Sequence, residues 1–151
     1  MSESSRTARD VVDEALRLLL AEDVSGFADL WAVDGVLEFP FAAAGYPQRL
    51  EGREAVREYM RGYPDLVTPR AVVEKTVHDT ADPGAVVVEF EVEGTVVSTG
   101  QPYRMRYIAV ITTRDGEILR YRDYWSPLAA AELTGGLDAL TASFTGGGST
   151  A

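Results

Sequence analysis

The segment with the clearest chemical potential is Glu117–Trp125, near the C-terminal end of the chain. In an extended strand, successive side chains point to opposite faces. One face would then carry Leu119, Tyr121, Asp123 and Trp125, and the other Arg120, Arg122 and Tyr124. Because two arginines mark a face that meets solvent, we expect Asp123 to point inward, among aromatic and aliphatic side chains.

A carboxyl group in such surroundings has two possible roles. Burial disfavours the charged form, so the pKa of Asp123 should rise toward the range that a general acid or base needs. A buried aspartate that only accepts hydrogen bonds or pairs with an arginine fits the same pattern. The pattern alone leaves both roles open.

The preceding segment, Tyr103–Thr113, repeats this alternation. Tyr103, Met105 and Tyr107 share one face, whereas Arg104 and Arg106 share the other. Tyr107 could donate a phenol hydrogen bond beside Asp123, or it could be a core aromatic with a satisfied hydroxyl. We predict Asp123 and Tyr107 as catalytic residues, with Tyr59 and Tyr63 as alternative donors.

Apolar residues at inward positions complete the picture of a cup with one carboxylate in its wall, the usual composition of a small-ligand site. Glu38, Glu89, Glu91 and Glu93 alternate with inward residues and are expected to face outward. The predicted substrate-binding residues are Trp31, Leu37, Phe39, Phe41, Tyr59, Met60, Tyr63, Phe90, Val92, Met105, Tyr121 and Trp125.

Other chemistry finds little support. His78 is the single histidine and there is no cysteine, so neither a metal site nor thiolate chemistry is expected. Gly146–Gly148 opens no helix after a strand, as a phosphate-binding loop would. We expect no metal and no cofactor, and the sequence does not define a role for His78.

Composition fits one globular domain. The chain has 151 residues, 46% hydrophobic and 25% charged, with a formal net charge of −10. That charge argues against nucleic acid as a partner, because phosphate binding needs clustered Lys and Arg. No apolar run approaches the ~20 residues of a membrane span, and no signal peptide is visible, so we expect a cytoplasmic protein.

The periodicities predict helices first and strands afterwards. Helices are expected over Thr7–Ala21, Gly26–Trp31, Arg53–Arg61 and Leu128–Leu133, and strands over Val36–Phe41, Ala71–Asp79, Ala85–Glu93, Tyr103–Thr113 and Glu117–Trp125. Asp-Gly at 115–116 is a hairpin signal. This order indicates an α+β fold: a cone-shaped, curved antiparallel sheet with N-terminal helices over its concave face. Residues 1–140 should form a single domain and 141–151 a flexible tail.

In this order the segments resemble the SnoaL-like branch of the nuclear transport factor 2-like superfamily, an α+β barrel fold. The resemblance covers roughly residues 8 to 135. The motifs that carry it are Asp34–Pro40, Leu50–Val56, Asp115–Ile118 and Tyr121–Trp125. They are specific for the fold rather than for the reaction, because this fold hosts many functions.

Branches of the superfamily differ at the matching positions. Limonene-epoxide hydrolases are similar at Asp123, but their second catalytic Arg and Asp fall on Phe90 and Val92, and their water-holding Tyr and Asn on Leu37 and Phe39. The base of ketosteroid isomerases falls on Phe39, and their oxyanion Tyr and second Asp on Ala15 and Ile108. Epoxide hydrolysis is therefore a lesser alternative, and steroid isomerisation is not expected.

SnoaL-like cyclases and phenazine-biosynthesis proteins resemble this chain at the acidic residue of the last strand. The resemblance implies a cofactor-free enzyme of secondary metabolism. Asp123 would act as general acid/base in cyclisation or isomerisation of a mostly apolar, polyketide-type or aromatic substrate. A non-catalytic binding module, or an interaction protein that dimerises through its sheet, remains open. The family also implies a homodimer.

Overall fold

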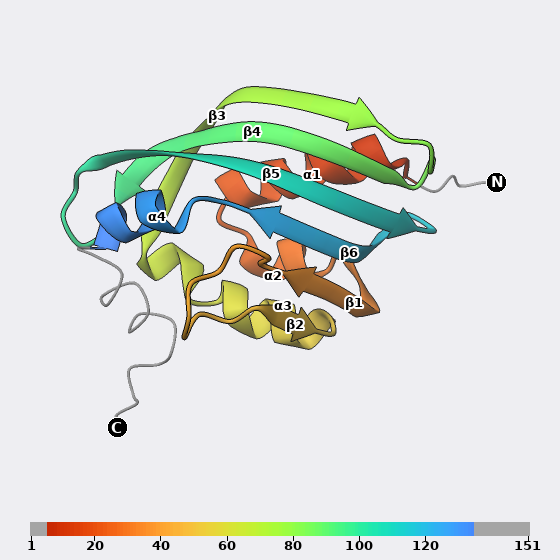
Figure 1. Cartoon of the computed structure of the whole chain (residues 1–151), viewed down its shortest axis with the longest axis horizontal. Coiled ribbons are helices and arrows are strands. Elements are labelled where there is room, and N and C mark those ends of the chain that lie inside the picture. Colours follow the sequence, from red (N-terminus) through yellow and green to blue (C-terminus); the bar gives the residue numbers. More distant parts are fainter. Residues whose placement is uncertain (1–5, 135–151) are drawn as a thin grey trace.

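The computed structural model describes residues 6–134, and these form one curved sheet with helices packed against it (Figure 1). The α+β class is confirmed. The predicted tail at residues 141–151 lies outside the described residues, as does the end of the predicted domain.

The helices largely follow the predicted pattern. They are α1 (Ala8–Leu20), α2 (Val24–Ala28), α3 (Arg53–Met60), the 3-10 turn η1 (Tyr63–Asp65) and α4 (Pro127–Thr134). Thr7 caps α1 through a reciprocal capping box with Asp10, which satisfies backbone donors at the helix start. Within residues 6–134, no helix is both long and apolar enough to cross a membrane.

The six strands are β1 (Trp31–Glu38), β2 (Arg49–Glu51), β3 (Val67–Asp79), β4 (Ala85–Val96), β5 (Pro102–Arg114) and β6 (Glu117–Tyr124). Their order across the sheet is β2-β1-β6-β5-β4-β3. Strands β3, β4, β5 and β6 form antiparallel pairs as expected, but β1 pairs with β6 in parallel. The sheet is curved and open rather than closed into a barrel.

The start of β1 corrects two sequence expectations. The helix expected over Gly26–Trp31 is α2, which Asp23 caps and which ends at Ala28, and Trp31 begins the strand instead. The strand then ends at Glu38, where Pro40 cannot donate a backbone hydrogen bond to a ladder. The expected strand over Val36–Phe41 is therefore shifted toward the N-terminus, and this shift changes the environment of Phe41.

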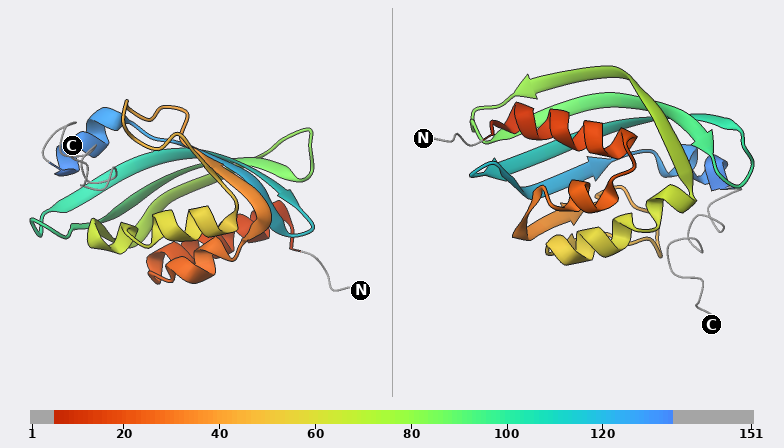
Figure 2. Two further views of the ribbon diagram at one scale, coloured as in Figure 1. Left: turned by 90° about the horizontal axis from the view of Figure 1, so that it is seen from below. Right: turned by 180° about the vertical axis from the view of Figure 1, so that it is seen from behind.

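The two faces of the sheet are covered differently. Helices α1, α2 and α3 lie against the concave side, hereafter the inner face, whereas α4 and the loop after β1 lie on the opposite, outer face (Figure 2). Val11, Val56 and Val88 are fully or almost fully buried in the core between the helices and the inner face. The inner face is thus the apolar, buried side of the sheet, and the outer face is more exposed to solvent.

The register of β6 is set by the predicted hairpin. Asp115 and Gly116 have φ values of 55° and 79°, the left-handed pair that a two-residue turn between twisted strands requires. The prediction that Leu119 faces inward is wrong. The pairing of β5 with β6 shifts by one residue at Leu119, so Ile118, with 0% exposure, faces the core instead. Beyond this bulge the predicted alternation is confirmed, and Asp123 lies opposite Ala109 on the inner face.

Candidate active site

A cavity of about 70 Å³ lies between the helices and the inner face. Ten predicted site residues line it: Trp31, Leu37, Phe39, Tyr59, Met60, Tyr63, Phe90, Tyr107, Tyr121 and Asp123. Leu16 and Leu19 of α1 and Phe27 of α2 complete the wall. These three were not predicted as site residues, since an apolar helix stripe looks the same whether it lines a cavity or fills a core.

Asp123 is the one acidic residue in this lining. It keeps some accessible surface, but its Oδ1 atom is buried and has no hydrogen-bond partner among the described residues. Burial raises the pKa of the Asp123 carboxyl to about 7, because the charged form loses its hydration without gaining a partner. A carboxyl group in this state can both accept and donate a proton near neutral pH.

Four tyrosines surround this carboxyl in the cavity wall: Tyr59, Tyr63, Tyr107 and Tyr121. Burial raises the pKa of each phenol well above 10, and negative charge on Asp123 raises it further. The phenols therefore stay protonated at neutral pH. They can donate hydrogen bonds but cannot serve as bases.

Stacked rings hold these side chains in place. Trp31 stacks on Tyr121 with 5.5 Å between ring centroids, and Phe90 stacks on Tyr107 at 5.0 Å. Tyr59 reaches the cavity from α3 and packs against Phe39 at 5.3 Å. Such ring pairs leave little freedom, so the donor groups are held in fixed positions.

Two arginines fix α3, the helix that carries Tyr59. Arg53 Nε donates to the Trp31 carbonyl at 2.8 Å, which ties the helix to β1. Arg57 donates to the carbonyl and hydroxyl of Ser25 and pairs with Asp29, which ties the helix to α2. These bonds make α3 part of the rigid frame of the cavity.

Four predicted site residues lie elsewhere. Phe41 was expected to face inward, and this is wrong: it is 61% exposed on the outer face, where its ring contacts Tyr124 at 5.1 Å. Strand alternation no longer applies to it because β1 ends at Glu38. Val92 and Met105 are buried in the core outside the cavity lining. Trp125 is buried too, packs on Phe39 and Tyr46, and borders the outer face instead of the cavity.

Tyr46 is the residue that sequence reasoning missed. Its hydroxyl lies 2.5 Å from the Tyr59 hydroxyl, and its buried ring packs edge-on against Phe39 and Trp125. It comes from the loop after β1, between Gly45 and Pro47, where no periodicity points to a buried side chain. An aromatic residue inside a small-residue loop was the available signal.

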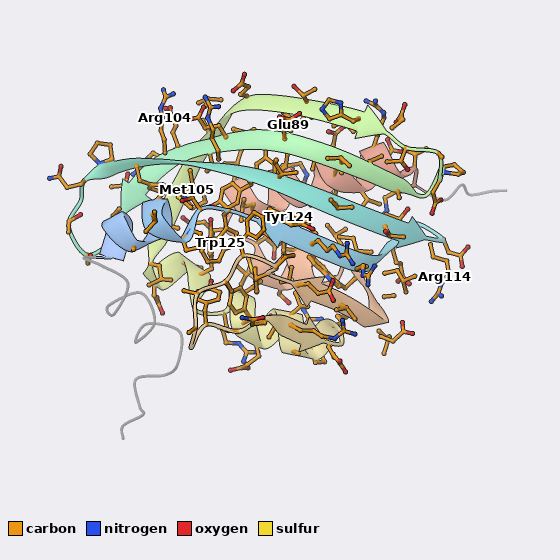
Figure 3. All side chains as sticks on the ribbon, viewed as in Figure 1. Glu89, Arg104, Met105, Arg114, Tyr124 and Trp125 are labelled. Carbon is orange, nitrogen blue, oxygen red and sulfur yellow. The ribbon has the colours of Figure 1, made fainter. Side chains whose placement is uncertain are left out.

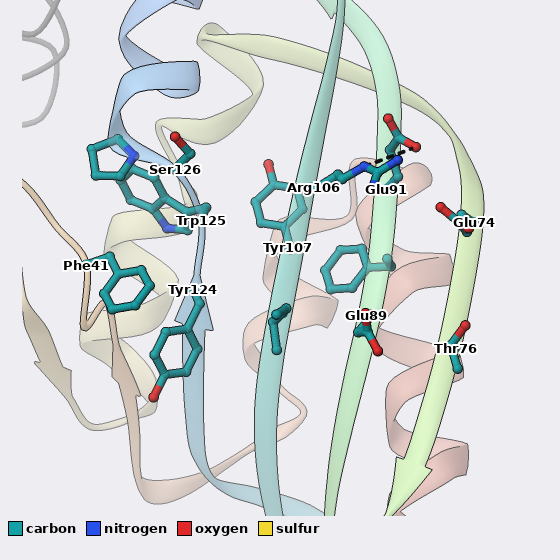
Figure 4. Close-up of a pocket in the computed structure, with 13 residues that line it drawn as sticks. Phe41, Glu74, Thr76, Glu89, Glu91, Arg106, Tyr107, Tyr124, Trp125 and Ser126 are labelled. Atoms are coloured by element: carbon teal, nitrogen blue, oxygen red, sulfur yellow. Dashed lines mark ion pairs between the residues drawn. The ribbon is translucent and has the colours of Figure 1, made fainter.

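A second, open hollow of about 600 Å³ lies on the outer face, under α4 and the loop after β1 (Figure 4). Tyr124 and Trp125, at the end of β6, form one side of it together with Phe41 (Figures 3 and 4). Glu74, Thr76, Glu89 and Glu91 form the other side. We call this hollow the outer groove.

Charges on the outer face are sorted by strand. Glu89, Glu91 and Glu93 lie on β4, and Arg104, Arg106, Arg120 and Arg122 lie on β5 and β6. Within the face, Arg104 pairs with Glu93 at 3.2 Å, and both Arg120 and Arg122 reach Glu38, at 3.3 and 3.2 Å. His78 is exposed and lies 2.6 Å from Glu89, so this histidine has no contact with the cavity.

Comparison with known proteins identifies the class. The model of the SnoaL-like domain family matches residues 12–121, and the chain belongs to this family. The fold is that of the nuclear transport factor 2-like superfamily, as the sequence resemblance implied.

Particular relatives extend over most of the chain. A PhzA/B-like protein of Pseudomonas aeruginosa is 41% identical over 132 residues, 87% of this chain and 93% of that protein. The crystal structure of a candidate isomerase from Bacillus subtilis is 41% identical, covers 87% of this chain and 97% of its own, and superposes with a TM-score of 0.79. A candidate polyketide cyclase from Pseudomonas putida shares the fold at 20% identity, over 85% and 98% of the two chains, with a TM-score of 0.73.

Proposed function

We propose that this protein is a cofactor-free cyclase or isomerase in which Asp123 is the general acid and base. One observation carries the proposal: a buried carboxyl with an unpartnered Oδ1 and a pKa of about 7 lies in the wall of an aromatic cavity. Membership of the SnoaL-like family supports this assignment, as do the names of the related candidate isomerase and polyketide cyclase.

The proposed chemistry starts with proton removal next to a carbonyl. Asp123, as the carboxylate, takes the proton from the carbon and leaves an enolate. In an isomerisation the acid returns this proton to another carbon of the same conjugated system. In a cyclisation the enolate carbon attacks a second carbonyl of the substrate, the C=O π bond opens to an alkoxide, and Asp123 gives its proton to that oxygen. Either reaction leaves Asp123 as it began, without a redox partner.

The phenols would stabilise the negative oxygen of the enolate. Tyr107 is our first choice, because it lines the cavity and its hydroxyl lies within the field of the Asp123 charge. Tyr59 meets the same criteria from α3. A preorganised donor aimed at developing charge is worth more in a dry cavity than in water.

The wall of the cavity suits a mostly apolar substrate. Apart from Asp123 and the phenols, its lining is aliphatic and aromatic. A polyketide-type or aromatic compound with an acidic C–H next to a carbonyl is therefore the substrate class that we propose, with a place in secondary metabolism. A lone carboxyl among phenols lacks the additional arginine and acid that the epoxide-hydrolase relatives use.

Solvent exchange tests this proposal without the natural substrate. The protein is incubated in D2O with aromatic β-dicarbonyl compounds, and deuterium at the α-carbon is followed by NMR. Asp123→Asn should slow enzyme-dependent exchange by about 10²–10⁴-fold, whereas Tyr124→Phe, on the outer face, should leave it unchanged. Deuterium exchange with Asp123→Asn at the wild-type rate would contradict the acid/base role. Compounds that bind the wild-type protein without deuterium exchange would indicate a binding module.

We also propose that the outer face binds a second copy of this chain. It exposes Phe41, Ile108 and Leu128 at 61%, 45% and 70%. A two-fold rotation about an axis through the face would bring the acidic strand β4 of one copy over the arginines of β5 and β6 of the other. Apolar side chains between stripes of opposite charge are what a self-complementary interface needs.

Oligomeric state tests this second proposal. Light scattering coupled to size-exclusion chromatography should give twice the 16.4 kDa chain mass, and Ile108→Arg should give the mass of one chain. Val33→Arg is the matched control, since Val33 is 73% exposed on β1 and does not line the outer groove. A wild-type protein that stays monomeric at high micromolar concentration would refute the proposal.

A further inference from the structure

The cavity is too small for the substrate class proposed above. Its volume is about 70 Å³, whereas an engineered protein cavity that holds benzene has roughly 150 Å³. A single aromatic ring is therefore larger than the cavity. If an aromatic compound reaches Asp123, part of the wall must first move.

One segment beside the cavity is joined to its neighbours through side chains. Residues 39–48, hereafter the covering segment, connect β1 to β2. Three backbone hydrogen bonds lie within the segment: Phe39 N donates to Gln48 O, Ala42 N to Phe39 O and Tyr46 N to Ala43 O, at 2.9 to 3.1 Å. The helices, by contrast, are tied across elements by Arg53 and Arg57.

Tyr46 joins the covering segment to its neighbours by both ring packing and a side-chain hydrogen bond. Its ring lies between Phe39 and Trp125, and its hydroxyl meets that of Tyr59 on α3. Phe39 and Tyr59 are both cavity-lining residues. Contact with Tyr46 thus joins the covering segment to the wall of the cavity in which Asp123 lies.

We propose that Tyr46 is a positioning residue: its hydrogen bond to Tyr59 holds the covering segment against the wall of the Asp123 cavity, at the end of β1, and thereby controls which ligands enter. Breaking the bond frees the segment, and outward movement of Tyr46 together with Phe39 enlarges the cavity beside Asp123. A ring-sized ligand with a polar group for the Tyr59 hydroxyl takes over the bond that Tyr46 gives up. This inference rests on the proposed function only in its choice of an aromatic ligand.

Hydrogen exchange followed by mass spectrometry tests the closure on the full chain without any ligand. Tyr46→Phe and Tyr59→Phe should each speed amide exchange in residues 39–48 by about fivefold, the factor expected for loss of one hydrogen bond. The double variant should add little to either single variant, because all three lack the same bond. Tyr124→Phe is the matched control: it keeps its ring against Phe41 of the same segment and should change nothing.

A binding rate supplies the second readout. The fluorescent phenol 2-naphthol, mixed rapidly with the protein, should associate about fivefold faster with Tyr46→Phe than with wild type, because entry requires the open state. Additive exchange effects, or unchanged exchange in both single variants, would overturn the closure. Failure of 2-naphthol to bind any variant would overturn ligand entry by this route. Neither result changes the outcome of the Asp123→Asn test, so the proposed role of Tyr46 and the proposed acid/base role of Asp123 can fail separately.

Discussion

Carboxyl groups on the two faces of the sheet have opposite environments: ion-paired on the outer face and buried on the inner face. On the outer face, Glu38 of β1 is held by Arg49, Arg120 and Arg122. On the inner face, Asp123 follows Arg122 directly in sequence, yet its Oδ1 has no partner within residues 6–134 and its pKa rises to about 7. Glu38 on β1 lies beside Arg122 on β6. A carboxylate held by ion pairs and a carboxyl whose pKa is raised by burial thus lie on neighbouring strands, on opposite faces of the sheet.

This contrast shows how the fold separates two tasks. Ion pairs between exposed groups contribute little to stability and keep a surface soluble, so the outer face can carry many. A buried acid without a partner costs free energy of folding, and the apolar packing around it must offset that cost. Within residues 6–134 Asp123 carries this cost, as the proposed acid/base role requires.

The largest expected effect compares two phenylalanines of the covering segment. Phe39→Ala should lower the free energy of unfolding by about 3–5 kcal/mol, because Phe39 is 2% exposed and packs against three aromatic rings. Phe41→Ala, at a 61% exposed position, should change it by less than about 0.5 kcal/mol at submicromolar protein concentration. Urea titrations measure both free energies of unfolding. Equal losses for the two variants would contradict the difference in burial between Phe39 and Phe41.

A medium effect concerns pH and stability. The pKa of Asp123 is raised from 3.8 to about 7 on folding, so the folded state holds an extra proton between these values, and stability from this group falls as pH rises through that window. Relative to Asp123→Asn, the wild type should therefore lose about 2–3 kcal/mol between pH 5 and pH 8. Parallel stability curves for the two proteins would show that the carboxyl is not desolvated.

The smallest effect belongs to the outer carboxylate. Glu38→Gln leaves Arg49, Arg120 and Arg122 without their common partner and should cost about 1 kcal/mol at low salt. The loss should shrink in 1 M NaCl, because salt screens exposed charges. A salt-independent loss above about 3 kcal/mol would mean that Glu38 is as critical as the inner residues.

Prediction from sequence succeeded where a pattern is local. The α1 stripe, the Asp115-Gly116 turn and the alternation from Arg120 to Asp123 each depend on neighbours along the chain, and each is confirmed. The inward direction of Asp123 followed from the arginines beside it. This local signal sufficed to predict that Asp123 points to the inner face, where it lines the cavity.

Prediction failed where distant segments decide. Phe41 continues an apolar alternation in sequence, but β1 pairs with β6 in parallel only as far as Glu38, and the chain then turns onto the outer face. Tyr46 is buried because Trp125 and Tyr59 lie beside it in space, which no period reveals. The bulge at Leu119 likewise appears only in the pairing with β5.

Direct titration of Asp123 tests the central claim. With carboxyl carbons of aspartate labelled with ¹³C, and Asp123→Asn used to assign the resonance, NMR across pH 3 to 9 reports the pKa of this one group in the folded protein. We expect a midpoint near 7. A midpoint near 3.8, its ordinary value, would mean that water or a counter-charge reaches the carboxyl, and the proposed acid/base role would lose its physical basis.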